Sequence, residues 1–175
     1  TATTEIYTLS YTTLFRSGEI TTHRYPMLET LPNWRRMFSS LYDLEPFVHD
    51  HYTYRSVEHA LQASKFRIAG KEAIAQKFCI ESGDTIGQSP ALTAHQSRKI
   101  AILTKDELGI WEKEKHSIKM NIYRSRFTQG NPANALKGTE TAELWNSGPR
   151  IQKIRCLSLE EIRSELYNMF PQSLL

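Results

Sequence analysis

YRSVEHALQASKF, residues 54–66, carries the clearest helix signal in this chain. Ser56 can accept a hydrogen bond from a backbone N–H of the first helical turn. The apolar residues that follow recur at i, i+4 and i+11, a spacing typical of the buried face of a helix: Val57, Leu61 and Ile68. Gly70 is a residue type that commonly follows a helix end. The pattern predicts a helix over 57–68.

Three polar residues share another face of this predicted helix. Glu58, Gln62 and Lys65 lie at i, i+4 and i+7, beside the apolar face and not within it. Glu58 is in the first turn, where the helix dipole favours an ionised carboxylate. Glu58 and Lys65 are too far apart for an i,i+4 pair, so they could flank a bound polar ligand. The alternative is a charge at the helix start and a solvated lysine.

The residues on either side predict a hairpin and two short helices. Residues 46–56 read PFVHDHYTYRS, an apolar pair, a polar His-Asp-His turn and alternating tyrosines, which is typical of a hairpin. Residues 71–80 predict a helix, and ESGDTIGQS at 81–89 predicts a loop that breaks it. Ser89-Pro90 starts the next helix, because proline at the first helical position loses no hydrogen bond.

A long helix is predicted from Thr104 to about Phe127. Thr104 and Glu107 have the spacing of a capping box. The expected apolar face consists of Leu108, Trp111, Ile118 and Ile122. Gly130 is expected to end this helix, and Asn131-Pro132 to start a short helix reaching about residue 137.

The C-terminal part predicts short strands and a last helix. Residues 139–145 and 151–156 have the character of extended segments, and Ser158 and Glu161 have capping-box spacing. The last helix carries its apolar residues at helical spacing: Leu159, Ile162, Leu166 and Met169. No internal repeat or linker is present, so we expect a single α+β domain that is mostly α-helical, with a small hairpin and short strands.

The composition is that of an ordinary globular protein. The chain has 175 residues, 39% of them hydrophobic and 23% charged, which favours folding over disorder. No apolar run approaches the ~20 residues that span a bilayer, and no secretory signal is apparent. Cys79 and Cys156 make no disulfide framework and lack the second cysteine pair of a zinc site. We expect a cytoplasmic protein with reduced thiols, no membrane association, no metal and no cofactor.

Charge and the chain start add two expectations. The net charge is +3, and residues 98–126 contain eight Lys and Arg against four acidic residues. This basic stretch is either a solvated helix face or a surface that favours phosphate-bearing substrates. Residues 1–17, TATTEIYTLSYTTLFRS, have no clear period, and part of them resembles a translated sequencing adapter. We expect residues 1–20 to be a non-native or disordered leader and 24–170 to be the domain; a genuine N-terminal strand is the alternative.

The pattern at 54–66 resembles the signature of the NADAR (YbiA-like) family: an aromatic residue, then Ser-x-Glu-His, then Gln-Ala-x-Lys-Phe. WRRMFSSL at 34–41, followed by Pro46-Phe47, resembles the family's opening segment. Further residues fall where the family has a Trp, a Met, a Lys-Phe, a Leu-x-x-Thr and a Glu-Leu element: Trp111, Met120, Phe127, Leu136, Thr139, Glu143 and Leu144. The resemblance covers about 34–166 and implies a NADAR-like fold.

Two positions depart from the family pattern. Family members usually have Leu-Ser-Asn where this chain has Phe-Ser-Ser at 38–40, and many have an Asp near a Trp-Gly motif after the Glu-Leu element. Here Trp145, Gly148 and Arg150 are present, but no Asp follows. Either Glu143 substitutes for that carboxylate, or this branch works differently or with reduced activity.

The resemblance implies hydrolysis of the N-glycosidic bond of a ribosylated base. Breaking that bond builds positive charge on the sugar, which a nearby carboxylate stabilises. Glu58 is the expected general base or electrostatic stabiliser, with Lys65 keeping it ionised and contacting phosphate or a ribose hydroxyl. Glu143 completes the expected catalytic set.

The resemblance also implies the substrate-binding residues. Arg35 or Arg36 would bind phosphate, since guanidinium suits that geometry. Trp111 and Tyr54 are candidates for stacking on the base, although core packing explains Trp111 equally well. The remaining expected binding residues are Ser39, His59, Gln62, Met120, Trp145 and Arg150. The alternatives are core lining for Met120, a solvated side chain for Arg150 and a packed or surface histidine for His59. The expected partner is an ADP-ribose-like or phosphoribosyl substrate, either ADP-ribosylated guanine in DNA, which the local basicity favours, or a riboflavin-pathway intermediate. No pattern indicates an oligomeric state.

Three other classes of protein compete with this expectation. A module that binds ADP-ribose or a nucleotide without turnover is favoured by the missing Asp. A metal-dependent hydrolase would use His49, Asp50, His51 and His59, but His-Asp-His on a turn is a poor chelate, and Glu-His lacks the second His of a zinc helix. A plain nucleic-acid-binding protein would need a denser basic cluster or an aromatic platform.

Overall fold

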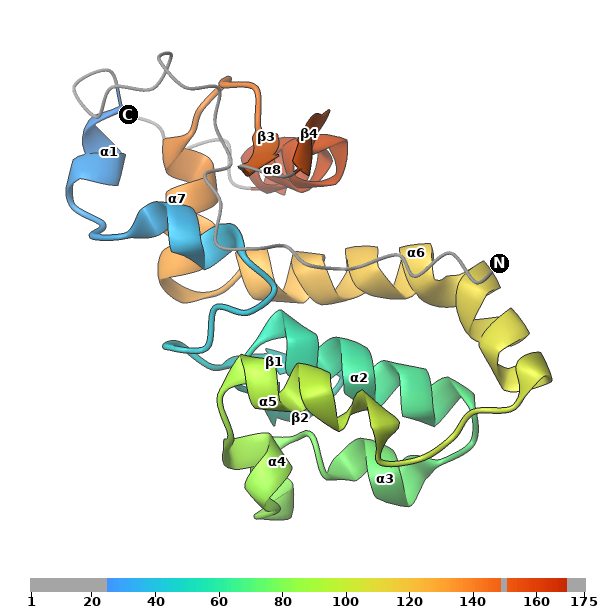
Figure 1. Cartoon of the computed structure of the whole chain (residues 1–175). Coiled ribbons are helices and arrows are strands. Elements are labelled where there is room, and N and C mark those ends of the chain that lie inside the picture. The colour runs from blue at the N-terminus through green and yellow to red at the C-terminus, as the bar shows by residue number, and fades with distance from the viewer. Residues whose placement is uncertain (1–24, 149–150, 170–175) are drawn as a thin grey trace.

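The computed structural model describes residues 25–148 and 151–169, which are mostly helical with two small antiparallel sheets (Figure 1). This confirms the α+β, mostly helical class. The helices are α1 (Pro26–Glu29), α2 (Val57–Ile68), α3 (Glu72–Gln76), α4 (Thr85–Gln88), α5 (Ala91–Gln96), α6 (Lys105–Phe127), α7 (Gly130–Gly138) and α8 (Leu157–Met169), with 3₁₀ turns η2 (Trp34–Phe38), η3 (Ile80–Ser82) and η4 (Ser97–Lys99). The predicted leader lies outside the described residues.

The segment around α2 folds as its sequence predicts. Strands β1 (Phe47–His49) and β2 (Tyr52–Tyr54) pair antiparallel, and the turn residues Asp50 and His51 both have positive φ, as a two-residue hairpin turn of the favoured twist requires. The Ser56 hydroxyl accepts a hydrogen bond from the His59 backbone N–H. Helix α2 therefore begins and ends at the predicted residues.

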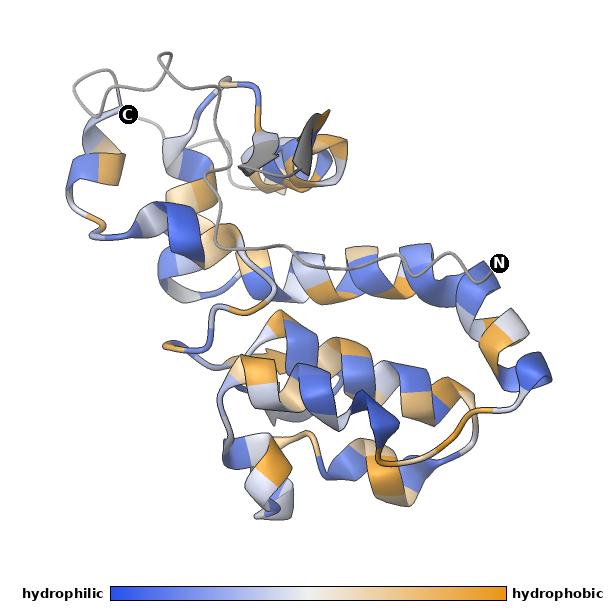
Figure 2. Cartoon of the chain, in the orientation of Figure 1, coloured by the Kyte–Doolittle hydropathy of each residue, from blue (hydrophilic) through white to orange (hydrophobic). Residues whose placement is uncertain are grey.

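Helix α2 packs along α6, and this pair forms the centre of the molecule (Figure 1). The buried core that surrounds it includes Phe38, Phe47, Tyr54, Phe66, Phe78, Ile122 and Phe127. Both helices carry hydrophilic and hydrophobic residues side by side along their length (Figure 2). The core side of α2 includes polar residues, because Glu58, His59 and Gln62 are buried, whereas Leu61 and Ile68 of the predicted apolar face are only partly buried.

Helix α6 confirms the capping box at Thr104 and Glu107, with both reciprocal hydrogen bonds present. It ends at Phe127, as predicted, but Gly130 does not end it. Gly130 has φ +60° and begins α7. The predicted apolar face is buried only toward the C-terminal end: Ile122 is buried, whereas Leu108 is 41% exposed.

The predicted loop at 81–89 is wrong, because η3 and α4 lie within it. Asp84 caps α4 by accepting a hydrogen bond from the Ile86 N–H. Gly87 lies so close to the Cys79 carbonyl oxygen that a Cβ would collide with it. The helix predicted over 71–80 is correspondingly shorter and ends at Gln76, because this segment folds back on itself.

The C-terminal part also differs from the prediction. The first expected strand, 139–145, is wrong for most of its length, since Thr139–Leu144 form a turn and an irregular segment, and β3 spans Trp145–Gly148. The second is correct and forms β4, Ile151–Arg155, antiparallel to β3. Helix α8 begins before Ser158, so the second capping box is wrong, and Met169 is 63% exposed, outside the core.

Candidate functional site

The Glu58 side chain is buried at the start of α2, with 3% of the residue exposed. Its backbone N–H donates to the Ser40 carbonyl oxygen at 2.9 Å, which joins the helix start to the segment after η2. Two nitrogen atoms contact the same carboxylate oxygen, Oε1, each at 2.8 Å: Nε2 of Gln62 and Nδ1 of His95. Within the described residues, Oε2 has no hydrogen-bond partner.

Helix α5 and the 3₁₀ turn after it, η4, each supply one residue whose side chain lies next to Glu58 or to its partner. Nδ1 of His95 faces Glu58, while Nε2 lies 2.8 Å from Nη1 of Arg98. Asp43 accepts a hydrogen bond from the Ala91 N–H at 2.8 Å and so fixes the first turn of α5. The chain between η2 and β1 therefore braces both helices that meet at Glu58, through Ser40 and Asp43.

A buried acceptor without a partner lies beside the carboxylate. Gln62 is 9% exposed, and while its Nε2 donates to Glu58, its Oε1 is buried and has no hydrogen-bond partner among the residues that the structure describes. Leaving such a group unsatisfied costs about 1–3 kcal/mol. A ligand hydroxyl or amino group that donates a hydrogen bond to Oε1 would satisfy it.

Lys65 lies on the same side of α2, half-buried. Burial lowers the pKa of its ammonium group, and the charge of Arg98 lowers it further, whereas Glu112 and Glu58 raise it. No direct ion pair between Lys65 and Glu58 is present in the described part of the chain. The charge of Glu58 therefore acts on Lys65 without a direct ion pair between the two side chains.

Helix α6 packs against α2, and its residues differ in how far they are buried. Met120 is buried in the core, as is Tyr123. Burial raises the pKa of the Tyr123 hydroxyl, and nearby Cys156 and Glu58 shift it further in the same direction. Trp111 is half-buried and is not among the fully buried core residues, so part of its ring is accessible.

Two residues that were expected to bind substrate are structural instead. Tyr54 is fully buried against Phe47 and Tyr52, and its hydroxyl accepts a hydrogen bond from Arg67, so neither ring face is open to a base. His59 is also fully buried. Its Nδ1 lies 2.8 Å from the Ser56 hydroxyl and its Nε2 lies 3.1 Å from the Ile86 carbonyl oxygen. His59 joins α2 to α4, and burial lowers its pKa to about 4.

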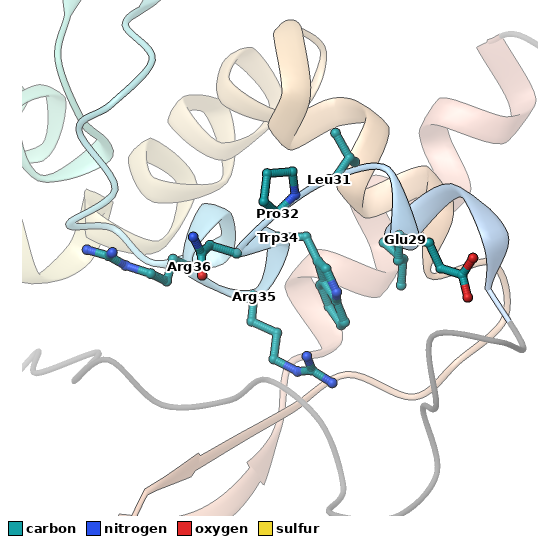
Figure 3. Close-up of a pocket in the computed structure, with 8 residues that line it drawn as sticks. Glu29, Leu31, Pro32, Trp34, Arg35 and Arg36 are labelled. Carbon is teal, nitrogen blue, oxygen red and sulfur yellow. The ribbon is translucent and has the colours of Figure 1, made fainter.

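Arg35 and Arg36 point in different directions from η2 (Figure 3). The Arg35 guanidinium lies 4.3 Å from the centre of the Trp34 ring, beside a concavity of about 430 Å³ that residues 28–36 line. Arg36 is exposed and also lines the concavity, but its guanidinium points away from that of Arg35. Ser39 is half-buried, and its hydroxyl accepts a hydrogen bond from the Leu41 N–H. The described contacts do not connect the two arginines to Glu58.

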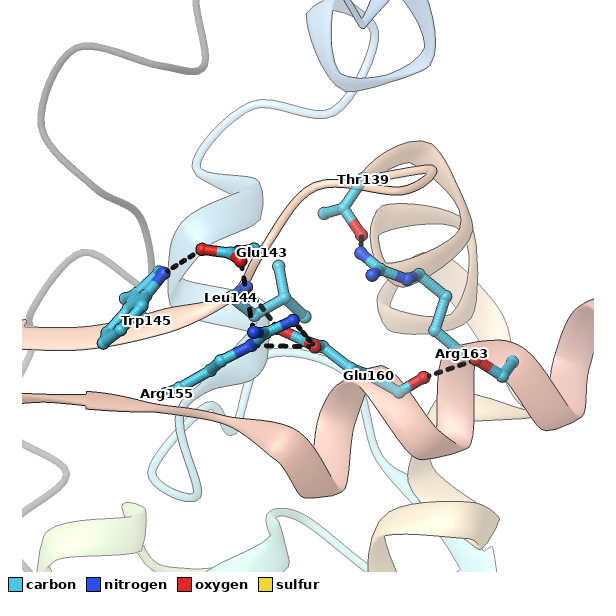
Figure 4. A network of polar contacts seen from close by, with 8 residues as sticks. Thr139, Glu143, Leu144, Trp145, Arg155, Glu160 and Arg163 are labelled. Atoms are coloured by element: carbon cyan, nitrogen blue, oxygen red, sulfur yellow. Dashed lines mark hydrogen bonds and ion pairs between the residues drawn. The ribbon is translucent and has the colours of Figure 1, made fainter.

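The C-terminal candidates belong to a separate network (Figure 4). Glu143 accepts a hydrogen bond from Nε1 of Trp145 and forms an ion pair with Arg155 at 3.1 Å. Arg155 also contacts Glu160, whose carboxylate accepts a hydrogen bond from the Leu144 N–H. Glu143 is therefore engaged at the β3–β4 hairpin and makes no described contact with Glu58. Arg150 lies outside the described residues.

The described residues hold neither a cluster of metal ligands nor a membrane-spanning helix. Nowhere in residues 25–148 and 151–169 do three His, Cys, Asp or Glu side chains gather as metal ligands. In the His-Asp-His turn, His49 contacts Asp50 through Nε2 at 3.3 Å and Ser125 through Nδ1 at 2.8 Å, whereas His51 is exposed. None of the helices in these residues has the length and apolar character needed to cross a bilayer.

Sequence reasoning missed His95 and Arg98. They lie three residues apart on one helical face, but this spacing is common in exposed helices and gives no local signal of function. Their significance comes from Glu58, which is 37 positions away from His95 in the chain.

No family model, curated protein or solved structure matches this chain.

Proposed function

We propose that this protein hydrolyses the N-glycosidic bond of a ribosylated base, with Glu58 as the central carboxylate, and that it has a NADAR-like fold. The observation that supports this most directly is the arrangement of Glu58: a buried carboxylate with two partners on Oε1 and none on Oε2 in the described residues. The sequence resemblance at residues 54–66 supports the same reaction. The two free thiols, Cys79 and Cys156, are compatible with the proposed cytoplasmic location.

The chemistry follows from the charge that develops on the sugar. As the C1′–N bond breaks, its electron pair leaves with the base nitrogen and positive charge spreads over C1′ and the ring oxygen. A fixed carboxylate stabilises that charge without reorganisation. Oε2 of Glu58 takes a proton from the attacking water, whose oxygen bonds to C1′, and the departing base takes up a proton from solvent.

Four residues suit a sugar phosphate as substrate. The orphan Oε1 of Gln62 can accept a hydrogen bond from a ribose hydroxyl. Lys65 and Arg98 add positive charge near the carboxylate, which suits a phosphate-bearing substrate. Trp111 offers a half-buried ring for base stacking.

The experiment that tests this function measures product release. Purified protein is incubated with DNA carrying ADP-ribosylated guanine and, separately, with phosphoribosyl intermediates of riboflavin synthesis, and free ADP-ribose, ribose phosphate or base is quantified. Glu58→Gln is expected to lose at least about 10²-fold in turnover. Glu114→Gln, which removes an exposed carboxylate from α6 that is not among the charges acting on Lys65, is the matched control. Equal turnover by Glu58→Gln and wild type would contradict the proposal.

A non-catalytic ADP-ribose or nucleotide-binding module is the second candidate. One observation favours it: Glu143, the carboxylate expected to assist Glu58, is engaged by Arg155 and Trp145. In that case the wild-type protein would bind ADP-ribose in calorimetry but release no product from any of the substrates tested.

A further inference from the structure

We infer that Arg98 and His95 form a positioning relay that holds Oε1 of Glu58 and leaves Oε2 as the reactive oxygen. The relay consists of two contacts in series, from Arg98 Nη1 to His95 Nε2 and from His95 Nδ1 to Glu58 Oε1, each 2.8 Å long. The role in turnover rests on the proposed function. The hydrogen-bonding pattern itself does not.

The donor and acceptor roles in this chain of contacts follow from the chemistry of the guanidinium group. Arginine has only N–H donors, so Nε2 of His95 must be the acceptor of its contact with Arg98. The ring proton is then on Nδ1, which donates to Glu58. Arg98 therefore selects the Nδ1–H tautomer of His95, the form that can donate to the carboxylate.

The relay fixes the orientation of the carboxylate. Gln62 Nε2, from one turn further along α2, contacts the same Oε1 that His95 contacts from α5. Two donors that converge on one oxygen from different helices prevent rotation about the Glu58 side chain, and they draw negative charge toward Oε1. Oε2, with no partner in the described residues, keeps its lone pairs available for a water or a sugar.

The surrounding structure holds the relay in place. Asp43 anchors the start of α5 through the Ala91 N–H, while Ser40, three residues earlier, binds the Glu58 N–H. The one segment thus sets the distance between α2 and α5. His95, near the end of α5, reaches Glu58 on α2, and Arg98, in η4, is exposed and contacts His95 from the solvent side.

The first test determines the tautomer directly and requires no turnover. Long-range ¹H–¹⁵N correlation spectra of protein labelled with ¹⁵N-histidine separate the two neutral tautomers, and the signal of His95 is assigned by its loss in His95→Leu. Wild type is expected to show Nδ1–H, and Arg98→Met a shift toward Nε2–H. Lys99→Met removes the neighbouring exposed charge and should leave the signal unchanged. An Nε2–H tautomer in wild type, or the same spectrum in Arg98→Met, would overturn the relay.

The second test measures turnover with the substrate that the wild-type protein cleaves. His95→Leu is expected to lower kcat by about 10²-fold with little change in KM, because a misplaced carboxylate loses that order of rate. His95→Asn, whose amide can donate near the Nδ1 position, should recover part of the loss. If His95→Leu keeps its kcat, the relay has no positioning role. If wild type shows Nδ1–H but cleaves no substrate, the proposed function fails while the tautomer assignment stands.

Discussion

His95 and Glu58, 37 positions apart in the chain, are joined by a 2.8 Å contact between Nδ1 of the imidazole and Oε1 of the carboxylate. The contact makes α5 part of the candidate site, although nothing in the local sequence of α5 indicates this. It also means that Glu58 is held from two helices, by His95 from α5 and by Gln62 from α2 itself. A buried carboxylate with such partners differs from a solvated charge at a helix start, which was the alternative interpretation of Glu58.

Folding stability is expected to fall in mild acid because of His59. Its pKa is lowered to about 4 in the folded protein by burial, whereas an unfolded histidine has a pKa near 6.5. The unfolded chain therefore binds more protons below pH 6.5, and the stability that neutral His59 contributes is lost as the pH falls from 6.5 toward 4. This residue alone should lower the free energy of unfolding by about 2 kcal/mol between pH 7.5 and pH 5.

Urea unfolding of wild type and His59→Gln at both pH values isolates this contribution. His49 also has a pKa lowered by burial and adds to the pH dependence of both proteins. The variant should have a smaller difference in stability between the two pH values. Identical pH dependence in the two proteins would show that His59 is not a buried neutral residue.

The N-terminus of α6 should depend on its capping box. Thr104 accepts a hydrogen bond from the Glu107 N–H, and Glu107 reciprocates at the Thr104 N–H. Thr104→Ala removes one of these bonds and should cost about 1 kcal/mol, a fall of roughly 2–4 °C in Tm for a protein of this size. Ser117→Ala, in the exposed middle of the same helix, is the control and should change Tm much less.

Arg126 should tolerate an apolar replacement of similar length better than a truncation. Arg126 is 1% exposed, and burial lowers its pKa to about 10. Its Nη1 donates to the Glu45 carbonyl oxygen, while Nη2 has no hydrogen-bond partner in residues 25–148 and 151–169. Its guanidinium lies against the rings of Tyr42 and Phe47. Arg126→Met keeps this packing and removes a buried charge, so its stability should stay within about 1 kcal/mol of wild type.

The comparison variant is Arg126→Ala, which leaves a cavity between the two rings and should cost roughly 2–5 kcal/mol. Denaturant midpoints measured by circular dichroism distinguish the two variants. A loss in Arg126→Met as large as that in Arg126→Ala would mean that the charge, and not the packing, stabilises this part of the core.

Lys65 is expected to affect substrate binding more than chemistry. Its ammonium group lies near Arg98 and Glu58 but does not pair directly with the carboxylate in the described residues. If Lys65 contacts a phosphate of the substrate, Lys65→Met should raise KM roughly tenfold, with a smaller change in kcat. A tenfold change corresponds to a loss of about 1.4 kcal/mol in the free energy of substrate binding. Lys113→Met removes an exposed charge from α6 and is the control for net charge. Equal KM values for the two variants would remove Lys65 from the binding site.

Local signals predict the elements that depend on nearby residues. The hairpin at 46–56, helix α2 and the start of α6 were all predicted correctly, because their turn residues and caps lie within a few positions of the groups that they satisfy. The errors occur where distant contacts decide. Helix α4 forms in a segment that lacks apolar periodicity, where Asp84 caps it and where His59, from α2, faces the Ile86 carbonyl.

The candidate site divides in the same way. The sequence by itself determined that Glu58, Gln62 and Lys65 share one face of a helix, because helical periodicity needs only the spacing of these residues. Only the tertiary structure decided that Glu58 is buried, that Gln62 has an unpaired oxygen beside it and that His95 contacts it. These properties arise when α5, α6 and the segment before β1 pack around α2, and no spacing within one helix specifies what packs against it.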